Sequence, residues 1–333
     1  ERTARYSVIS GEMRHLPHIQ DARYFSWGTF AAPESAPLLE RLTPDYLAAA
    51  LTDCLRCVIN DVVDPSGLLP IAQRHVRDLP EIANELAFLL VLQGDFAGAL
   101  AVFDHWPDDS VQSINRTCLK AFIATIQGED EKAQNAINEA IAQAKHGTRK
   151  RNVFPDNPAF AVALVALVRR DTLEATELLV HLLSVAKKQK LQPAEVLFAA
   201  GALSARDRDF EPSMFGRWVR DTHAIGLQCC WREDFSALEY PHNRTAFFTL
   251  LVNARHNGFR WLYAEAGAIL EQMGADQSLY LDTPDIDAHI KASAEERAAL
   301  RVVPFAEAVR ALPPWEVALK GLEQVAHEVS SSG

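Results

Sequence analysis

Residues 94–103 read Gly-Asp-Phe-Ala-Gly-Ala-Leu-Ala-Val-Phe, and residues 128–137 read Gly-Glu-Asp-Glu-Lys-Ala-Gln-Asn-Ala-Ile. The two stretches match at a spacing of 34 residues in a glycine, a later alanine and a large apolar residue one helical turn beyond it. This spacing is typical of arrays of helix pairs, in which a single pair cannot bury its own apolar face. The repeat therefore predicts a stacked helical surface, and it does not indicate what binds there.

Each recurring position has a physical role in this prediction. A glycine between two helices permits a sharp turn. The alanine allows paired helices to approach closely, and the larger apolar residue fills the space between neighbouring units. A third unit follows at a spacing of 42 residues, with 8 extra residues in the connection 147–158. The predicted repeat positions are Gly94, Phe96, Ala99, Phe103, Gly128, Ala133, Ile137, Ala175 and Leu179.

The rest of the chain predicts an all-α fold, a solenoid of antiparallel helix pairs with a small irregular N-terminal portion that contains short strands. Thr43-Pro44 predicts the start of a helix that runs to residue 60. Asn243 is expected to cap a helix over 244–257, and residues 274–290 are expected to form a loop before a helix at 294–301. The predicted domains are an N-terminal helical and irregular subdomain (1–79), the helical repeats (80–230) and a C-terminal helical subdomain (231–333).

The composition limits the class of protein. The chain has 333 residues, 48% of them apolar, and a net charge of −11, which argues against a surface that binds nucleic acid over its whole area. Its five cysteines are an odd number in a long chain, so we expect reduced thiols and a cytoplasmic location. No apolar run is long enough to cross a bilayer, and no membrane partner is expected. Because the chain begins at Glu1, we expect it to belong to a longer protein.

The motifs of known catalytic sites are incomplete. The phosphate-binding Gly-x-x-x-x-Gly-Lys-Ser/Thr motif is absent, so we expect no nucleotide bound through such a loop. Cys54 and Cys57 have the spacing of a redox or zinc motif, but they lie in the middle of an expected helix and are interpreted as core thiols. Cys229-Cys230 has histidines nearby in sequence, and core or loop cysteines are favoured there over a metal site. We therefore expect no catalytic residue, no metal and no cofactor in this chain.

Two basic clusters follow the second helices of the second and third units. Equivalent helix ends in a stacked array lie on the same edge, about 10 Å apart, so the clusters are expected to converge on one rim. Such a rim suits a phosphate backbone, an acidic peptide or an acidic protein face. The alternative is that these cations only offset helix dipoles and keep a long loop solvated. The basic rim consists of Lys145, Arg149, Lys150, Arg151, Lys187, Lys188 and Lys190.

Two families resemble parts of this sequence. The stretch Gly94-Asp95-Phe96, with Ala99 and Phe103, is similar to the tetratricopeptide (TPR) pattern, although the second copy has Asp130 where an aromatic residue is usual. The motifs 128–153, with Asn257-Gly258-Phe259-Arg260-Trp261-Leu262 and Pro314-Trp315-Glu316, resemble the helical region that precedes the motor in large bacterial SNF2-family helicases.

The SNF2 resemblance implies a non-catalytic interaction or scaffold region of an ATP-driven, DNA-associated helicase whose ATPase core lies outside this chain. Its partners would be the motor of the same polypeptide, a partner protein, or a DNA backbone held by the basic rim. The alternative hypothesis is a regulatory TPR-like sensor array of a signalling ATPase or transcription activator, which binds a protein or small effector. A stand-alone enzyme has no supporting motif.

Overall fold

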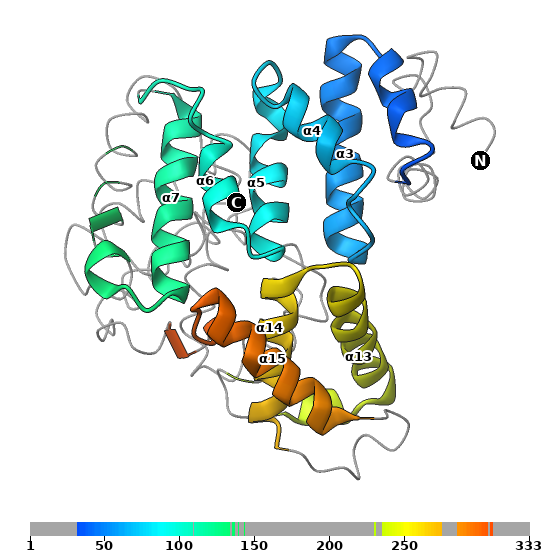
Figure 1. Ribbon diagram of the computed structural model, residues 1–333, viewed down its shortest axis with the longest axis vertical. Helices are drawn as coiled ribbons and strands as arrows, with labels where there is room; N and C mark the ends of the chain where they lie inside the picture. The colour runs from blue at the N-terminus through cyan, green and yellow to red at the C-terminus, as the bar shows by residue number, and fades with distance from the viewer. Residues whose placement is uncertain are drawn as a thin grey trace, which may run out of the picture. The chain divides into compact units, whose positions relative to one another are not determined.

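The structure of the chain is a computed structural model, and Figure 1 shows it as a ribbon diagram. In the residues that it describes, the secondary structure is helical and contains no strand, as the all-α prediction requires. The N-terminal residues 1–31, for which the sequence predicts an irregular portion, lie outside the described residues. The described residues are 32–108, 110–133, 135–136, 139, 143, 230, 235–274, 285–305 and 307–308.

Several of the described helices are followed by a tight turn. These turns contain a residue with positive φ, which reverses the chain direction within a few residues. The α-helices are α3 (Pro44–Asp61), α4 (Leu69–His75), α5 (Ala83–Leu92), α6 (Phe96–Ala101), α7 (Val111–Ile126), α13 (Pro241–His256), α14 (Arg260–Gln272) and α15 (Ile286–Leu300). The 3₁₀ helices are η2 (Ala36–Arg41), η3 (Pro80–Ile82) and η5 (Ser236–Glu239).

The chain divides into two compact units. The first contains residues 1–105 and 249–263, and the second contains residues 106–248 and 264–333. The boundary passes through α13 and through α14, so each of these helices contributes one part to each unit. The sequence-based boundaries at 79 and 230 stay a prediction.

In the first unit, α5 is the central helix. It packs against α3, α4 and α6, and η2 packs against α3 and α4. All of its residues except Asn84 and Glu85 are buried, so it is apolar around most of its circumference. A helix of this kind is stable only when neighbours surround it, because an apolar helix exposed to water would lose the hydrophobic contribution of each side chain.

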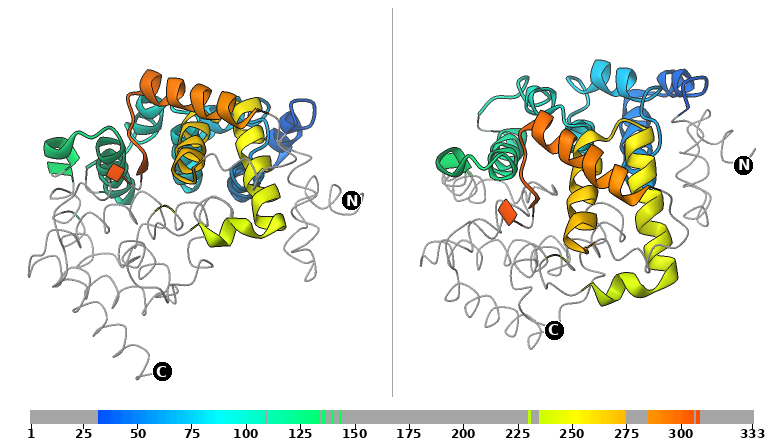
Figure 2. Two further views of the ribbon diagram at one scale, coloured as in Figure 1. Left: turned by 90° about the horizontal axis from the view of Figure 1, so that it is seen from below. Right: turned by 60° about the horizontal axis from the view of Figure 1, so that its bottom comes forward.

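In the second unit, α14 and α15 cross closely (Figures 1 and 2). Gly267 of α14 faces the fully buried Ser293 of α15, and a β-carbon at position 267 would overlap the Ser293 side chain. Arg297 of α15 donates to the carbonyl of Ala264 at 3.2 Å and forms an ion pair with Glu271. The small residue on α14 thus permits the close approach, and Arg297 fixes the crossing by polar contacts.

The start of α15 differs from the sequence prediction. Residues 286–290, expected in a loop, form the first part of α15, and the helix begins directly after Asp285. The described C-terminal end agrees with the expected one, since α15 ends at Leu300. The loop prediction failed because 286–293 lacks a continuous apolar stripe, and the helix is held by its contact with α14 instead.

The start of α13 also differs. Asn243 was expected to cap a helix over 244–257, but α13 already begins at Pro241. The Asn243 side chain instead donates to the carbonyl of Ala237 in η5 at 2.8 Å. Proline in the first turn of a helix is favourable, because its missing N–H has no partner there anyway, and this local preference sets the start of α13.

Candidate functional site

The turn after α5 and the turn after α7 have the same geometry 34 residues apart. Gly94 has φ 79° and Gly128 has φ 67°. The Gly94 and Gly128 N–H groups donate to the carbonyls of Val91 and Thr125, at 2.8 and 3.1 Å. The next residue in each turn donates to the carbonyl five residues back, at 2.8 and 2.9 Å. These two hydrogen bonds define the Schellman motif, so the sequence repeat corresponds to a repeat in local structure.

The residues after each turn are buried as the repeat predicts. Ala99 and Ala133 have no exposed surface, and Phe103 is 1% exposed. Phe96, at the aromatic position of the motif, is partly exposed at the start of α6. Ile137, Ala175 and Leu179 lie outside the described residues, so the third unit stays a prediction.

A third turn of this kind lies between α13 and α14, inside a segment that carries the SNF2 resemblance. Gly258 has φ 75°, and Phe259 donates to the carbonyl of Ala254 at 2.9 Å. Asn257 links this turn to the C-terminal end of α3, because its side chain donates to the carbonyl of Val62 at 2.7 Å. Phe259 and Trp261 are completely buried in the same unit. In this turn the motif residues therefore have structural roles.

The basic rim lies outside the described residues. Its seven cations fall in the stretch 144–229 that precedes Cys230, and the structure neither brings them together nor separates them. The convergence of Lys145, Arg149, Lys150 and Arg151 with the Lys187–Lys190 cluster therefore stays a prediction.

The two cysteines of the Cys-x-x-Cys motif are core residues. Cys54 and Cys57 lie in the middle of α3 and are 0% and 5% exposed. Burial raises the pKa of Cys54 well above its ordinary value and raises the pKa of Cys57 to about 11. Thiols with raised pKa values carry little thiolate at neutral pH, and thiolate is the form that attacks disulfides and binds metals. The interpretation as core thiols is confirmed for this pair.

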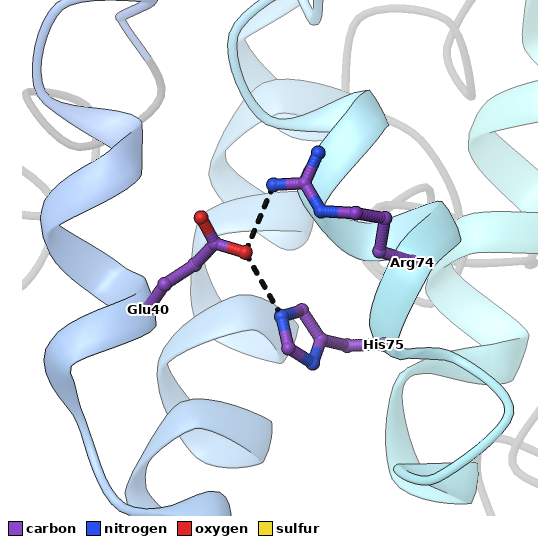
Figure 3. A network of polar contacts seen from close by, with 3 residues as sticks. All are labelled: Glu40, Arg74 and His75. Carbon is purple, nitrogen blue, oxygen red and sulfur yellow. Dashed lines mark hydrogen bonds and ion pairs between the residues drawn. The ribbon is translucent and has the colours of Figure 1, made fainter.

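Sequence reasoning did not identify the polar cluster between η2 and α4, shown in Figure 3. One carboxylate oxygen of Glu40 accepts a hydrogen bond from Arg74 Nη2 at 2.8 Å and lies 3.1 Å from His75 Nε2. The hydrogen bond from Arg74, followed by the one from His75, lowers the pKa of Glu40. All three side chains are accessible to solvent, so the cluster joins two helices at the surface.

A second site missed by sequence reasoning is the buried carboxylate of Glu265. This residue of α14 is 3% exposed, and both of its oxygens lie within hydrogen-bond distance of the Phe305 N–H, at 3.0 and 3.2 Å. Burial raises the pKa of Glu265 to about 7, against the opposing effects of the Phe305 hydrogen bond and the charge of Arg297. The available signal was an acidic residue between Ala264 and Ala266, inside the apolar part of the helix.

In the part of the chain that the structure describes, His, Cys, Asp and Glu side chains form no group of three that is placed to hold a metal ion. No helix within the described ranges combines the length and the apolarity that crossing a bilayer requires.

The described residues define an all-α protein whose helices are joined by repeated glycine turns. Comparison of the chain with protein-family models, curated proteins and solved structures found no significant match. The TPR and SNF2 resemblances consequently rest on the sequence motifs alone, and what they imply belongs among the proposals.

Proposed function

We propose that this chain is a non-catalytic interaction region of a large SNF2-family bacterial helicase, with the ATPase core elsewhere in the polypeptide. The observation that carries the proposal is the recurrence of one helix–turn–helix geometry at Gly94 and Gly128, at the spacing typical of stacked helix pairs. The turn at Gly258, which is followed by the buried Phe259 and Trp261, supports it, because this turn lies in a segment that resembles the helicase region.

In this proposal the helix pairs continue as a TPR-like solenoid through the third unit. Each pair exposes one edge to solvent, and the basic rim lies along that edge. Seven cations on a chain of net charge −11 would create a local positive potential, which attracts phosphate groups or acidic protein surfaces. The partner is the motor domain, another protein, or the DNA on which the motor acts.

The reading frame of the parent protein tests the helicase assignment. We expect it to continue beyond residue 333 into a nucleotide-binding motif and the remaining motor motifs of an SNF2 ATPase. A parent frame without these motifs would remove the helicase assignment and favour the sensor hypothesis.

Titration of labelled duplex DNA tests the role of the rim. We compare the unmodified chain with the triple variant Arg149→Glu, Lys150→Glu and Arg151→Glu, at several salt concentrations. If the rim holds a phosphate backbone, the variant binds more weakly and shows a smaller slope of log K against log salt. The matched control reverses three exposed cations in the described residues, Arg41, Arg77 and Lys291, and changes the net charge equally. Equal losses in both variants, or no binding by the unmodified chain, would leave a protein as the partner.

A further inference from the structure

Residues 301–305, which we call the latch segment, tie three helices of the second unit together. The segment begins where α15 ends, at Arg301 with φ 56°, and the Val302 N–H donates to the carbonyl of Arg297 at 3.0 Å. The Val303 N–H then donates to the carbonyl of Ile126 at the end of α7, at 2.7 Å. Two residues later, the Phe305 N–H reaches Glu265 of α14. The latch segment therefore holds α7, α14 and α15 through three backbone N–H groups.

The Glu265 end of the latch segment is enclosed. Phe305 is 2% exposed, and its ring lies 6.0 Å from the ring of Phe122 of α7, at a tilt of 45°. Both carboxylate oxygens of Glu265 point at the same N–H group. Within the described ranges this is the one donor to Glu265, and a buried carboxylate with a single backbone donor is poorly compensated for the water it has lost.

Among the residues that the structure describes, the charged groups around Glu265 do not complete the compensation. On α15, the positive charge of Arg297 acts on Glu265 and lowers its pKa. The guanidinium group of Arg297 donates its hydrogen bonds elsewhere, to the Ala264 carbonyl and to Glu271. Glu271, on the same helix as Glu265, shares that cation. From α7, the residues at the junction are the uncharged Phe122 and Ile126. From the latch segment, the group that faces Glu265 is the Phe305 N–H.

We propose that Glu265 is a proton-controlled latch, which holds residues 301–305 on α14 when the carboxyl group is neutral and favours their release when it is ionised. A neutral carboxyl group still accepts the Phe305 N–H through its carbonyl oxygen, and it avoids the cost of a buried charge. When the segment detaches, Glu265 is exposed to water and its charge is solvated. The docked state therefore binds the proton more tightly than the open state, and loss of the proton shifts the equilibrium toward the open state. This inference does not depend on the proposed helicase function.

Hydrogen exchange of the full chain between pH 6 and pH 8 tests the latch, with rates corrected for intrinsic exchange. The readout is the peptide that covers residues 301–308, and the internal control is the peptide that covers α5 in the first unit. In the unmodified chain, the latch peptide should lose about tenfold in protection over this interval, because raising the pH removes the proton that the docked state binds. The α5 peptide should lose none through this linkage.

The matched variant is Glu265→Gln, which keeps an acceptor for the Phe305 N–H and cannot ionise. Its latch peptide should show no pH-dependent loss. Equal losses in the unmodified chain and in Glu265→Gln would overturn the proposal, and so would constant protection in both.

A second variant, Arg297→Gln, tests the same linkage without altering the carboxyl group. Removing the cation raises the pKa of Glu265 further, so protection should go on falling to a higher pH than in the unmodified chain. Arg297→Gln keeps a donor for the Ala264 carbonyl, which limits damage to the crossing of α14 and α15. A loss of protection that ends at a lower pH contradicts the proposal. If this variant does not fold, the comparison with Glu265→Gln still decides.

Discussion

Glu40 and Glu265 are both glutamates near an arginine, yet their pKa values move in opposite directions. Glu40, at the surface of the first unit, accepts a hydrogen bond directly from Arg74, and its pKa is lowered. Glu265, in the interior of the second unit, accepts from a backbone N–H, and its pKa is raised to about 7. Arg297, whose charge acts on Glu265, donates its own hydrogen bonds to other groups.

The difference follows from two causes, the donor that each carboxylate accepts from and its access to water. At Glu40 the hydrogen bond from the charged Arg74 lowers the pKa and outweighs the opposing effect of partial burial. At Glu265 the loss of water outweighs one neutral donor and an indirect cation. The surface cluster is therefore expected to contribute little to stability, and the buried one to make stability depend on pH near neutrality.

The largest expected change in the free energy of unfolding comes from Gly267→Ala. This substitution forces α14 and α15 apart and so moves Arg297 away from Glu265. The added β-carbon overlaps the side chain of the fully buried Ser293, so we expect a loss of about 3 kcal/mol in the free energy of unfolding. Urea denaturation followed by circular dichroism measures this loss. The double variant with Ser293→Gly should recover most of it, because it empties the volume that the β-carbon needs. A single variant as stable as the unmodified chain would show that the helices do not cross so closely.

The next effect is the dependence of stability on pH that Glu265 introduces. Below its ordinary pKa of 4.5, the carboxyl group is protonated in both the folded and the unfolded chain. Between 4.5 and about 7 the folded chain keeps a proton that the unfolded chain has released, so stability falls as the pH rises. Above about 7 the loss is complete, and it amounts to about 3 kcal/mol at most. The difference in unfolding free energy between the unmodified chain and Glu265→Gln, measured from pH 4 to pH 8, should follow this curve. A flat difference would contradict the raised pKa.

The same contrast shows what the sequence could predict. Features set by neighbouring residues were predicted correctly, such as the start of α3 at Pro44, the turns at Gly94 and Gly128, and the buried thiols of α3. Glycine and proline restrict the backbone wherever they occur, so their effect can be recognised without knowing the fold.

Features set by distant residues could not be predicted. Glu265 and Phe305 are 40 residues apart, and Glu40 lies 34 residues from Arg74, with no local pattern that links them. The short helices η2 and α4 were also not predicted, because they are held by packing against α3 and α5 and carry too few residues to show a periodicity. The basic rim depends on a similar distant convergence and therefore remains a prediction.

A smaller loss of unfolding free energy is expected from substitutions in the turn between α13 and α14. The substitutions change no charged group, so this loss should not depend on pH. Gly258 has φ 75°, and no atom lies within 4 Å of the position of an added β-carbon. Gly258→Ala should therefore lose only the cost of a left-handed backbone, about 1 kcal/mol. Gly258→Asn should lose less, since asparagine tolerates this conformation better. The losses should be equal at pH 5 and pH 8, and an alanine variant that gains stability would exclude the left-handed turn.

The smallest change in the free energy of unfolding is expected from a substitution of Glu40. Its dependence on pH should be opposite to that of Glu265. Glu40→Gln should cost about 0.5 kcal/mol or less at neutral pH, because the ion pair with Arg74 is exposed and screened. Since the folded pKa is lowered, the contribution is present above the ordinary pKa of 4.5 and is lost as the pH falls below it. Urea titrations at pH 7 and pH 3, at low and high salt, measure the change, and the exposed Glu34→Gln serves as the matched control. A cost that persists in high salt would mean that Glu40 is more shielded from water than its exposure indicates. In that case access to water would not be one of the causes of the difference between Glu40 and Glu265.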